Sequence, residues 1–128
     1  MEITRFSSGA KWEDIVGYSR VVKAGNRIIV GGTTAIDVKS NLVGKGDAYL
    51  QTKFVFQKIQ KYLLLAGANL EDVIINRIYV TDISKWEEIG RAHAEFFGKI
   101  KPCCNMIEVK SFVDPDMIVE IETEASIS

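Results

Sequence analysis

Residues 47–81 read DAYLQTKFVFQKIQKYLLLAGANLEDVIINRIYVT and contain two elements around which the rest of the chain can be arranged. The first, residues 47–66, has the apolar spacing of a helix. Its apolar face comprises Val55, Phe56, Ile59, Tyr62, Leu63 and Ala66. Asp47 can cap the start of this helix, and Gly67 can end it in the left-handed conformation.

The second element, residues 72–81, alternates as a strand. Its two faces carry Val73, Ile75 and Tyr79 on one side and Ile74, Ile78 and Val80 on the other. A strand that is largely apolar on both faces is covered on both sides, which predicts a central position in a sheet.

Toward the N-terminus, two stretches rich in Val and Ile, 18–24 and 27–33, predict a pair of strands. The Gly25-Asn26 dipeptide between them is typical of a tight hairpin turn. The second strand ends on Gly31-Gly32, where the lack of side chains lets another backbone or a ligand approach closely.

Toward the C-terminus, residues 84–87 read SKWE and match a capping box, which predicts that a second helix begins there. The apolar stripe of this helix consists of Trp86, Ile89, His93, Phe96, Phe97 and Ile100. Two stretches with period-two alternation, 103–110 and 117–127, predict the last two strands.

The expected order is β-β-α-β-α-β-β in one domain that spans residues 1–128. Two helices packed on one face of a mixed sheet make an α+β sandwich. The last strand places Glu120, Glu122 and Glu124 on one face. Because carboxylates cannot pack against a dry core, this face is expected to meet water or a polar subunit interface.

The composition excludes several classes of protein. With 47% apolar and 26% charged residues, the chain of 128 residues is globular rather than disordered. Sixteen basic and seventeen acidic residues give a net charge of −1, which provides no electrostatic footprint for nucleic acid. No apolar run is long enough to span a membrane, and residues 1–5 lack the basic start and apolar run of a signal peptide, so we expect none.

The cysteines indicate a reduced, cytoplasmic protein. Cys103 and Cys104 are neighbours and cannot close a loop. Together with the single histidine, His93, they fall short of a zinc pattern, so we expect no metal. His93 lies on an apolar stripe and is interpreted as a packed, hydrogen-bonded side chain. Cys104 would be a nucleophile only if a cation or a helix N-terminus acidified its thiol, so an unreactive, half-buried residue is favoured.

Carboxylates inside apolar strands are the remaining candidates for chemistry. Glu120 has apolar neighbours and is a better candidate than Glu108 for a general base, with a salt bridge to a neighbouring strand or subunit as the alternative. Residues 31–34 read GGTT, which is not a phosphate loop. Thr33 could still offer a hydroxyl and a backbone N–H to a small anion.

Two stretches, PCCNMIEV at 102–109 and DPDMIVEIE at 114–122, resemble the signature of the Rid family, which is also called YjgF-like. Further agreement is found in GYSR at 17–20, IVGGT at 29–33, AGANLEDV at 66–73 and AEFF at 94–97. The resemblance extends from about residue 14 to the end. It implies a chorismate-mutase-like fold and a homotrimer with the sheets inside, the helices outside and a small-molecule cleft at each subunit interface.

Active members of this family hydrolyse reactive enamines and imines, such as 2-aminoacrylate, to keto acids and ammonia without a metal or organic cofactor. The resemblance places Tyr18, Gly32, Thr33, Gly90, Cys104, Asn105 and the catalytic Glu120 in the cleft. Active members have an arginine at the position of Cys104, which clamps the substrate carboxylate, and a polar residue at the position of Gly90.

These departures lead us to expect a cleft that binds or acts on a small metabolite without the standard 2-imino acid deaminase activity. One alternative is a deaminase that uses another cation, such as Arg5 or Arg20, for the substrate carboxylate. A second alternative is a protein-interaction role, chaperone-like or inhibitory to translation. We expect no nucleic-acid or membrane partner.

Overall fold

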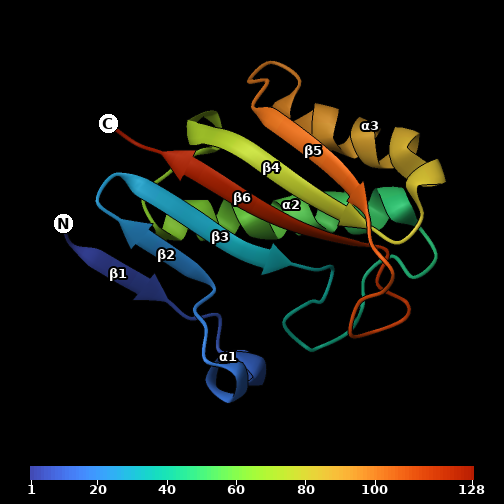
Figure 1. Cartoon of the computed structure of the whole chain (residues 1–128), viewed down its shortest axis with the longest axis horizontal. Helices are drawn as coiled ribbons and strands as arrows, with labels where there is room; N and C mark the ends of the chain where they lie inside the picture. The colour runs from blue at the N-terminus through green and yellow to red at the C-terminus, as the bar shows by residue number, and fades with distance from the viewer.

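The structure is a computed structural model that describes all 128 residues. Its core is a six-stranded mixed sheet with the order β1-β2-β3-β6-β4-β5 (Figure 1). The strands are β1 (Ile3–Phe6), β2 (Val21–Ala24), β3 (Arg27–Thr33), β4 (Val73–Val80), β5 (Cys103–Glu108) and β6 (Val119–Ser126). The helices are α1 (Lys11–Val16), α2 (Ala48–Leu65) and α3 (Trp86–Phe97), and 3-10 turns lie at Leu70–Asp72 and Ile83–Lys85.

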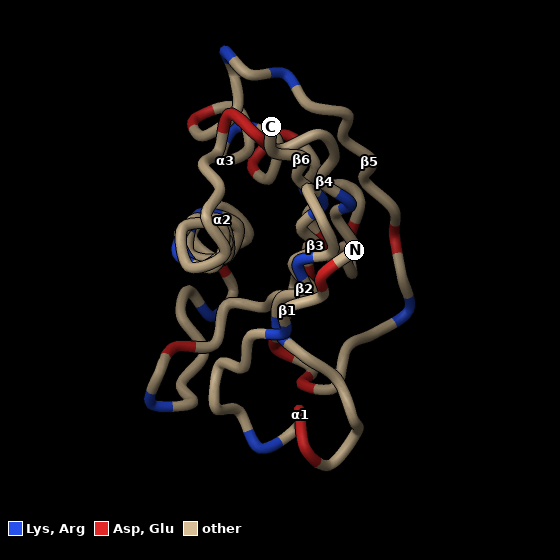
Figure 2. The backbone as a smooth tube through the Cα atoms, turned by 90° about the vertical axis from the view of Figure 1, so that its left-hand side faces the viewer, with Lys and Arg blue, Asp and Glu red and all other residues tan.

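The architecture confirms the predicted α+β sandwich. Helices α2 and α3 lie on one side of the sheet, and the short α1 lies beyond its lower end (Figure 2). Only β4 and β5 are parallel, and every other pair of strands is antiparallel. None of the helices combines the length and the hydropathy that a bilayer crossing needs.

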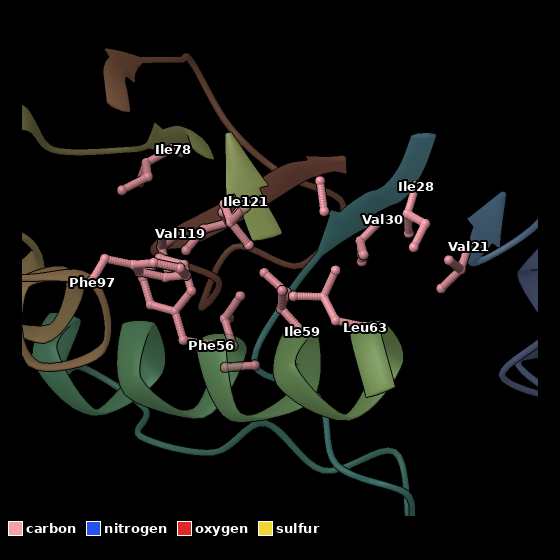
Figure 3. Packing of buried hydrophobic residues seen from close by; sticks show 14 of the residues in the cluster. Val21, Ile28, Val30, Phe56, Ile59, Leu63, Ile78, Phe97, Val119 and Ile121 are labelled. Atoms are coloured by element: carbon pink, nitrogen blue, oxygen red, sulfur yellow. The ribbon is translucent and has the colours of Figure 1, made fainter. Parts of the chain in front are cut away.

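Helix α2 forms where the sequence predicts it. The Asp47 carboxylate accepts a hydrogen bond of 2.9 Å from the Leu50 N–H, and Gly67 adopts a φ of 90° after the last turn. Phe56, Ile59 and Leu63 are fully buried against the sheet (Figure 3). Burial of each such side chain contributes about 1.5–3 kcal/mol, so this face fixes the helix on the sheet.

The start of the second predicted helix is wrong. Ser84 does not cap α3, because it belongs to a 3-10 turn in which the Asp82 carboxylate accepts its backbone N–H at 3.0 Å. Helix α3 begins at Trp86, and its N-cap residue Lys85 makes no side-chain cap bond. An aspartate two residues before a serine forms a local turn, and that turn takes the place of the capping box.

The predicted order also lacks β1 and α1. Strand β1 has four residues and pairs with β2 from Ile3↔Ala24 to Phe6↔Val21. Helix α1 has six residues and ends at Gly17, whose φ is 91°. The strand predicted from residue 18 therefore begins only at Val21. Both missed elements are too short to show a period in the sequence.

The face of the sheet without helices carries the predicted acidic stripe. Glu124 forms ion pairs with Arg77, at 2.7 Å, and with Arg27. Glu122 accepts a hydrogen bond from the Tyr79 hydroxyl. Glu120 is the one member of the stripe with neither an ion pair nor a side-chain hydrogen bond within the chain.

Candidate functional site

A β-bulge in β3 forms the centre of the candidate site. The register between β3 and β6 shifts between Val30 and Thr33, at the two consecutive glycines. A Cβ atom on Gly32 would lie 2.6 Å from Oε2 of Glu120, and one on Gly31 would lie 2.8 Å from Nη2 of Arg20. The sequence predicted a close approach by a backbone or a ligand, and the structure places two side chains there.

Glu120 is half-buried beside this bulge. Burial raises the pKa of its carboxyl group above the usual value, although the positive charge of Arg20 opposes this effect. A carboxyl group with a raised pKa and no ion-pair partner is able to exchange a proton with a bound molecule. Glu120 therefore has the properties of an acid–base group, and the alternative of a salt bridge within the chain is not observed.

The Glu120 carboxylate borders a hollow of about 320 Å³ on the face without helices. The hollow is lined by Tyr79, Val109, Ser111, Phe112, Glu120 and Glu122. Tyr79 is directly opposite Glu120 in the register of β4 and β6. Sequence reasoning did not select Tyr79 or Ser111, because their proximity to Glu120 depends on the strand order. No three His, Cys, Asp or Glu side chains are grouped so that they could hold a metal ion.

Arg20 is the cation of this site. Its Nη2 donates a hydrogen bond of 2.7 Å to the Gly32 carbonyl oxygen, and its guanidinium carbon lies 5.7 Å from the centre of the Tyr18 ring. Tyr18 is 41% exposed and lines a second hollow, of about 430 Å³, together with Arg5. The structure thus brings Tyr18, Gly32 and Glu120 to one place, with Arg20 between them.

Thr33 lies at the same bulge but faces inward. Its side chain is fully buried, and its hydroxyl donates a hydrogen bond of 2.8 Å to the Gly31 carbonyl oxygen. This hydroxyl stabilises the bulge.

The other predicted site residues lie elsewhere in the chain. Cys104 and Asn105 are exposed on β5, at the far edge of the sheet, and Gly90 lies on α3. Three strand-to-strand steps separate β5 from β3, which is about 14 Å at the usual spacing. A Cβ atom on Gly90 would meet no atom within 4 Å. Within one chain the predicted site therefore falls into two groups, one at the bulge and one at the β5 edge.

The cysteines have the properties of unreactive thiols. Both are free and exposed. Desolvation raises the pKa of the Cys104 thiol, and no cation lowers it. A raised pKa reduces the thiolate fraction at neutral pH, which disfavours a nucleophilic role.

His93 is the packed histidine that the sequence predicts. Its ring lies 5.5 Å from the Phe56 ring and 5.0 Å from the Phe97 ring. Its Nε2 lies 3.1 Å from Nδ2 of Asn76, and Oδ1 of the same Asn76 side chain accepts a hydrogen bond from the Thr123 hydroxyl. Because an amide nitrogen only donates, Nε2 accepts, and burial accordingly lowers the pKa of His93.

Comparison with known proteins places this geometry in a family. The sequence profile of the family described as endoribonuclease L-PSP matches residues 9–127. An uncharacterized protein of Streptomyces coelicolor is 37% identical over 96% of this chain and 91% of its own length. The 3-aminoacrylate deaminase RutC of Acinetobacter baylyi is 33% identical, with 86% of each chain covered.

A solved structure agrees over nearly the whole chain. Rv2704 of Mycobacterium tuberculosis, a member of the YjgF/YER057c/UK114 family, is 44% identical and superposes with a TM-score of 0.90. The match covers 98% of this chain and 100% of that one. It confirms the chorismate-mutase-like α+β fold. By profile, sequence and fold, the chain belongs to the endoribonuclease L-PSP family, also known as the YjgF or Rid family.

Proposed function

We propose that this protein binds or transforms a small metabolite in a cleft between the subunits of a homotrimer, with Glu120 as the acid–base group. The observation that carries the proposal is a half-buried carboxyl group with a raised pKa and no ion pair, held against the backbone of Gly32. The deaminase activity named for the Acinetobacter relative supports a small nitrogen-containing metabolite as the ligand.

The division of the candidate residues into two groups supports a cleft between subunits. A single chain keeps the β5 edge, with Cys104 and Asn105, about 14 Å from the bulge at Gly32. A second copy that places its β5 edge beside the bulge would complete one cleft from both groups. We place the protein in the cytoplasm, where its two free, exposed thiols would stay reduced.

The proposed cleft lacks the standard 2-imino acid deaminase activity. A cysteine at position 104 has no positive charge with which to clamp a substrate carboxylate. A charge-assisted hydrogen bond contributes about 1.5–3 kcal/mol, so its loss slows the reaction about 10- to 100-fold, and loss of the bidentate geometry slows it further.

The test compares keto-acid release from freshly generated 2-aminoacrylate by the wild type, Cys104→Arg and Cys104→Arg/Glu120→Gln. We expect a wild-type rate close to the uncatalysed rate and a rise of at least about tenfold in Cys104→Arg, because the charged clamp is restored. The added Glu120→Gln should abolish the gained activity.

Two results would count against the proposal. Rapid keto-acid release by the wild type would show that an arginine at position 104 is not needed for this activity. A gained activity that survives Glu120→Gln would remove Glu120 from the chemistry. If Cys104→Arg folds but stays inactive, the variant Gly90→Asn/Cys104→Arg follows, because open space surrounds position 90. Inactivity of that variant as well would show that the cleft serves a different reaction.

A further inference from the structure

We infer that Arg20 is the anion-binding group of the cleft, and that the ligand therefore carries a carboxylate or another small planar oxyanion. The inference rests on the proposed function, because it names the class of ligand for that same cleft. It assigns the charged contact to a residue that directly precedes β2, rather than to position 104 on β5.

The hydrogen bonds of Arg20 are incomplete. A guanidinium group has five N–H donors, and the chain supplies one acceptor, the Gly32 carbonyl oxygen, at 2.7 Å from Nη2. Arg20 Nε is the one buried side-chain nitrogen or oxygen in the chain that has no partner. A buried donor without an acceptor is unfavourable, so the site favours a molecule that brings oxygen atoms to the guanidinium group.

The charge of Arg20 is not neutralised within the chain. No carboxylate lies within ion-pair distance of it. Glu13 and Glu120 are close enough to feel this charge, which contributes to the lowered pKa of Glu13 and opposes the rise in the pKa of Glu120. The neighbouring cation Lys58 differs, because its ammonium group donates to the carbonyl oxygens of Thr34, at 2.7 Å, and Ile36, at 2.8 Å. Arg20 is thus a positively charged group whose N–H donors are not all used within the chain.

The position of Arg20 is fixed before any ligand binds. Its backbone N–H donates to the Phe6 carbonyl at 2.9 Å, and its carbonyl accepts from the Gly31 N–H at 3.0 Å. The Tyr18 ring lies beside the guanidinium group, and the missing side chain of Gly31 leaves room for Nη2. A guanidinium group that is already held by the Gly32 carbonyl oxygen and flanked by the Tyr18 ring loses little conformational freedom on binding, which favours a small ligand.

A carboxylate fits this arrangement better than a neutral group. The planar fork of a guanidinium group matches the two oxygens of a carboxylate. Glu120, on the other side of Gly32, would then face the part of the ligand next to its carboxylate. Arg5 is a matched control, because it is an exposed arginine that lines the adjacent hollow beside Glu13 and Asp14.

The experiment measures the preference for a carboxylate over its amide. Propionate and propionamide are titrated by NMR into the wild type, Arg20→Gln and Arg5→Gln. We expect the wild type and Arg5→Gln to bind propionate at least about tenfold more tightly than propionamide, because only the carboxylate gains charge-assisted bonds. In Arg20→Gln the two dissociation constants should agree within about threefold.

A second measurement needs no variant. The side-chain Nε–H signal of Arg20 should shift in the wild type when propionate is added and stay in place with propionamide. If Arg20→Gln does not fold, Arg20→Lys keeps the charge but not the planar fork, and its preference for propionate over propionamide should be smaller than that of the wild type. These readouts follow the arginine itself rather than the stability of the fold.

Several outcomes would overturn the inference. They are a wild type that binds neither probe or both equally, an Arg20→Gln variant that keeps the preference, and an Arg20 signal that propionate leaves unmoved. The proposed function would survive each of them if Glu120→Gln still abolished the activity gained by Cys104→Arg. Conversely, loss of Glu120 dependence would remove the proposed function even if propionate bound to Arg20.

Discussion

Glu120 is held in a place that favours its uncharged form. Burial raises the pKa of its carboxyl group above 4.5, its value in the unfolded chain. Its contribution to stability is therefore fully present below pH 4.5 and is lost as the pH rises through the value in the folded protein. Above that value, the folded protein holds an ionised carboxylate in a position that disfavours it.

Replacing Glu120 with glutamine should therefore stabilise the protein. The free energy of unfolding of Glu120→Gln should exceed that of the wild type at pH 7, and the difference should shrink as the pH falls toward 4.5. Urea unfolding at both pH values measures the difference. Glu122→Gln is the control, because it weakens the bond from the Tyr79 hydroxyl and should not stabilise. A Glu120→Gln variant less stable than the wild type at pH 7 would contradict this assignment.

At the level of single residues, the sequence predicts which side chains are unusual better than it predicts which residues they contact. Glu120 stands out as an acid among apolar neighbours, and its burial bears this out. The packed state of His93 also follows from its place on an apolar stripe. The contact of Arg20 with Gly32 could not be predicted, because it depends on a bulge that shifts the register by one residue.

At the scale of the element, Gly90 lies inside α3 without a structural need for glycine. A Cβ atom there would meet nothing within 4 Å. Gly90→Ala should raise the free energy of unfolding by about 0.5–1 kcal/mol, because alanine loses less backbone freedom in a helix. Denaturant unfolding of the variant and the wild type measures this difference in the free energy of unfolding.

Gly98 provides the matched control for this prediction. A Cβ atom at Gly98 would lie 2.6 Å from the Ala94 carbonyl oxygen, so Gly98→Ala should destabilise the protein. A loss of stability in Gly90→Ala would show that position 90 contacts another subunit in the assembled protein.

The elements that could be predicted are those that repeat their pattern several times. The predicted helix at 47–66 and strand at 72–81 agree with α2 and β4 to within about one residue at each end. The four residues of β1 and the six of α1 are too few for a repeating pattern of apolar residues. Pairing with β2 defines β1, and the C-cap at Gly17 ends α1. A competing side chain, Asp82, explains the error at Ser84.

At the scale of the whole molecule, we expect three chains to assemble. The sheet face without helices carries charged side chains that are paired with each other, and one chain leaves the candidate site in two parts. Light scattering coupled to size exclusion should therefore give three times the chain mass of 14.3 kDa. A mass equal to that of one chain would remove both the trimer and the cleft between subunits.

The alternation of apolar and polar residues along the chain does not predict the order of the strands in the sheet. Glu120 meets Gly32 on one side and Tyr79 on the other because β6 lies between β3 and β4. Patterns of apolar residues define strands but not their neighbours. Only the resemblance to a known family paired Glu120 with Gly32 before the structure showed that the two residues lie close together.

The central place of β6 also affects how the protein is made. During synthesis, β6 emerges after both strands that it joins. Until then, β3 and β4 each have one edge whose backbone N–H and C=O groups lack a partner strand. Such edges are sites of unwanted pairing with other chains. Until Val119–Ser126 has been synthesised, the sheet therefore consists of two separate parts, β1-β2-β3 and β4-β5. Strand β6 then pairs with β3 and β4 and joins the two parts into one sheet.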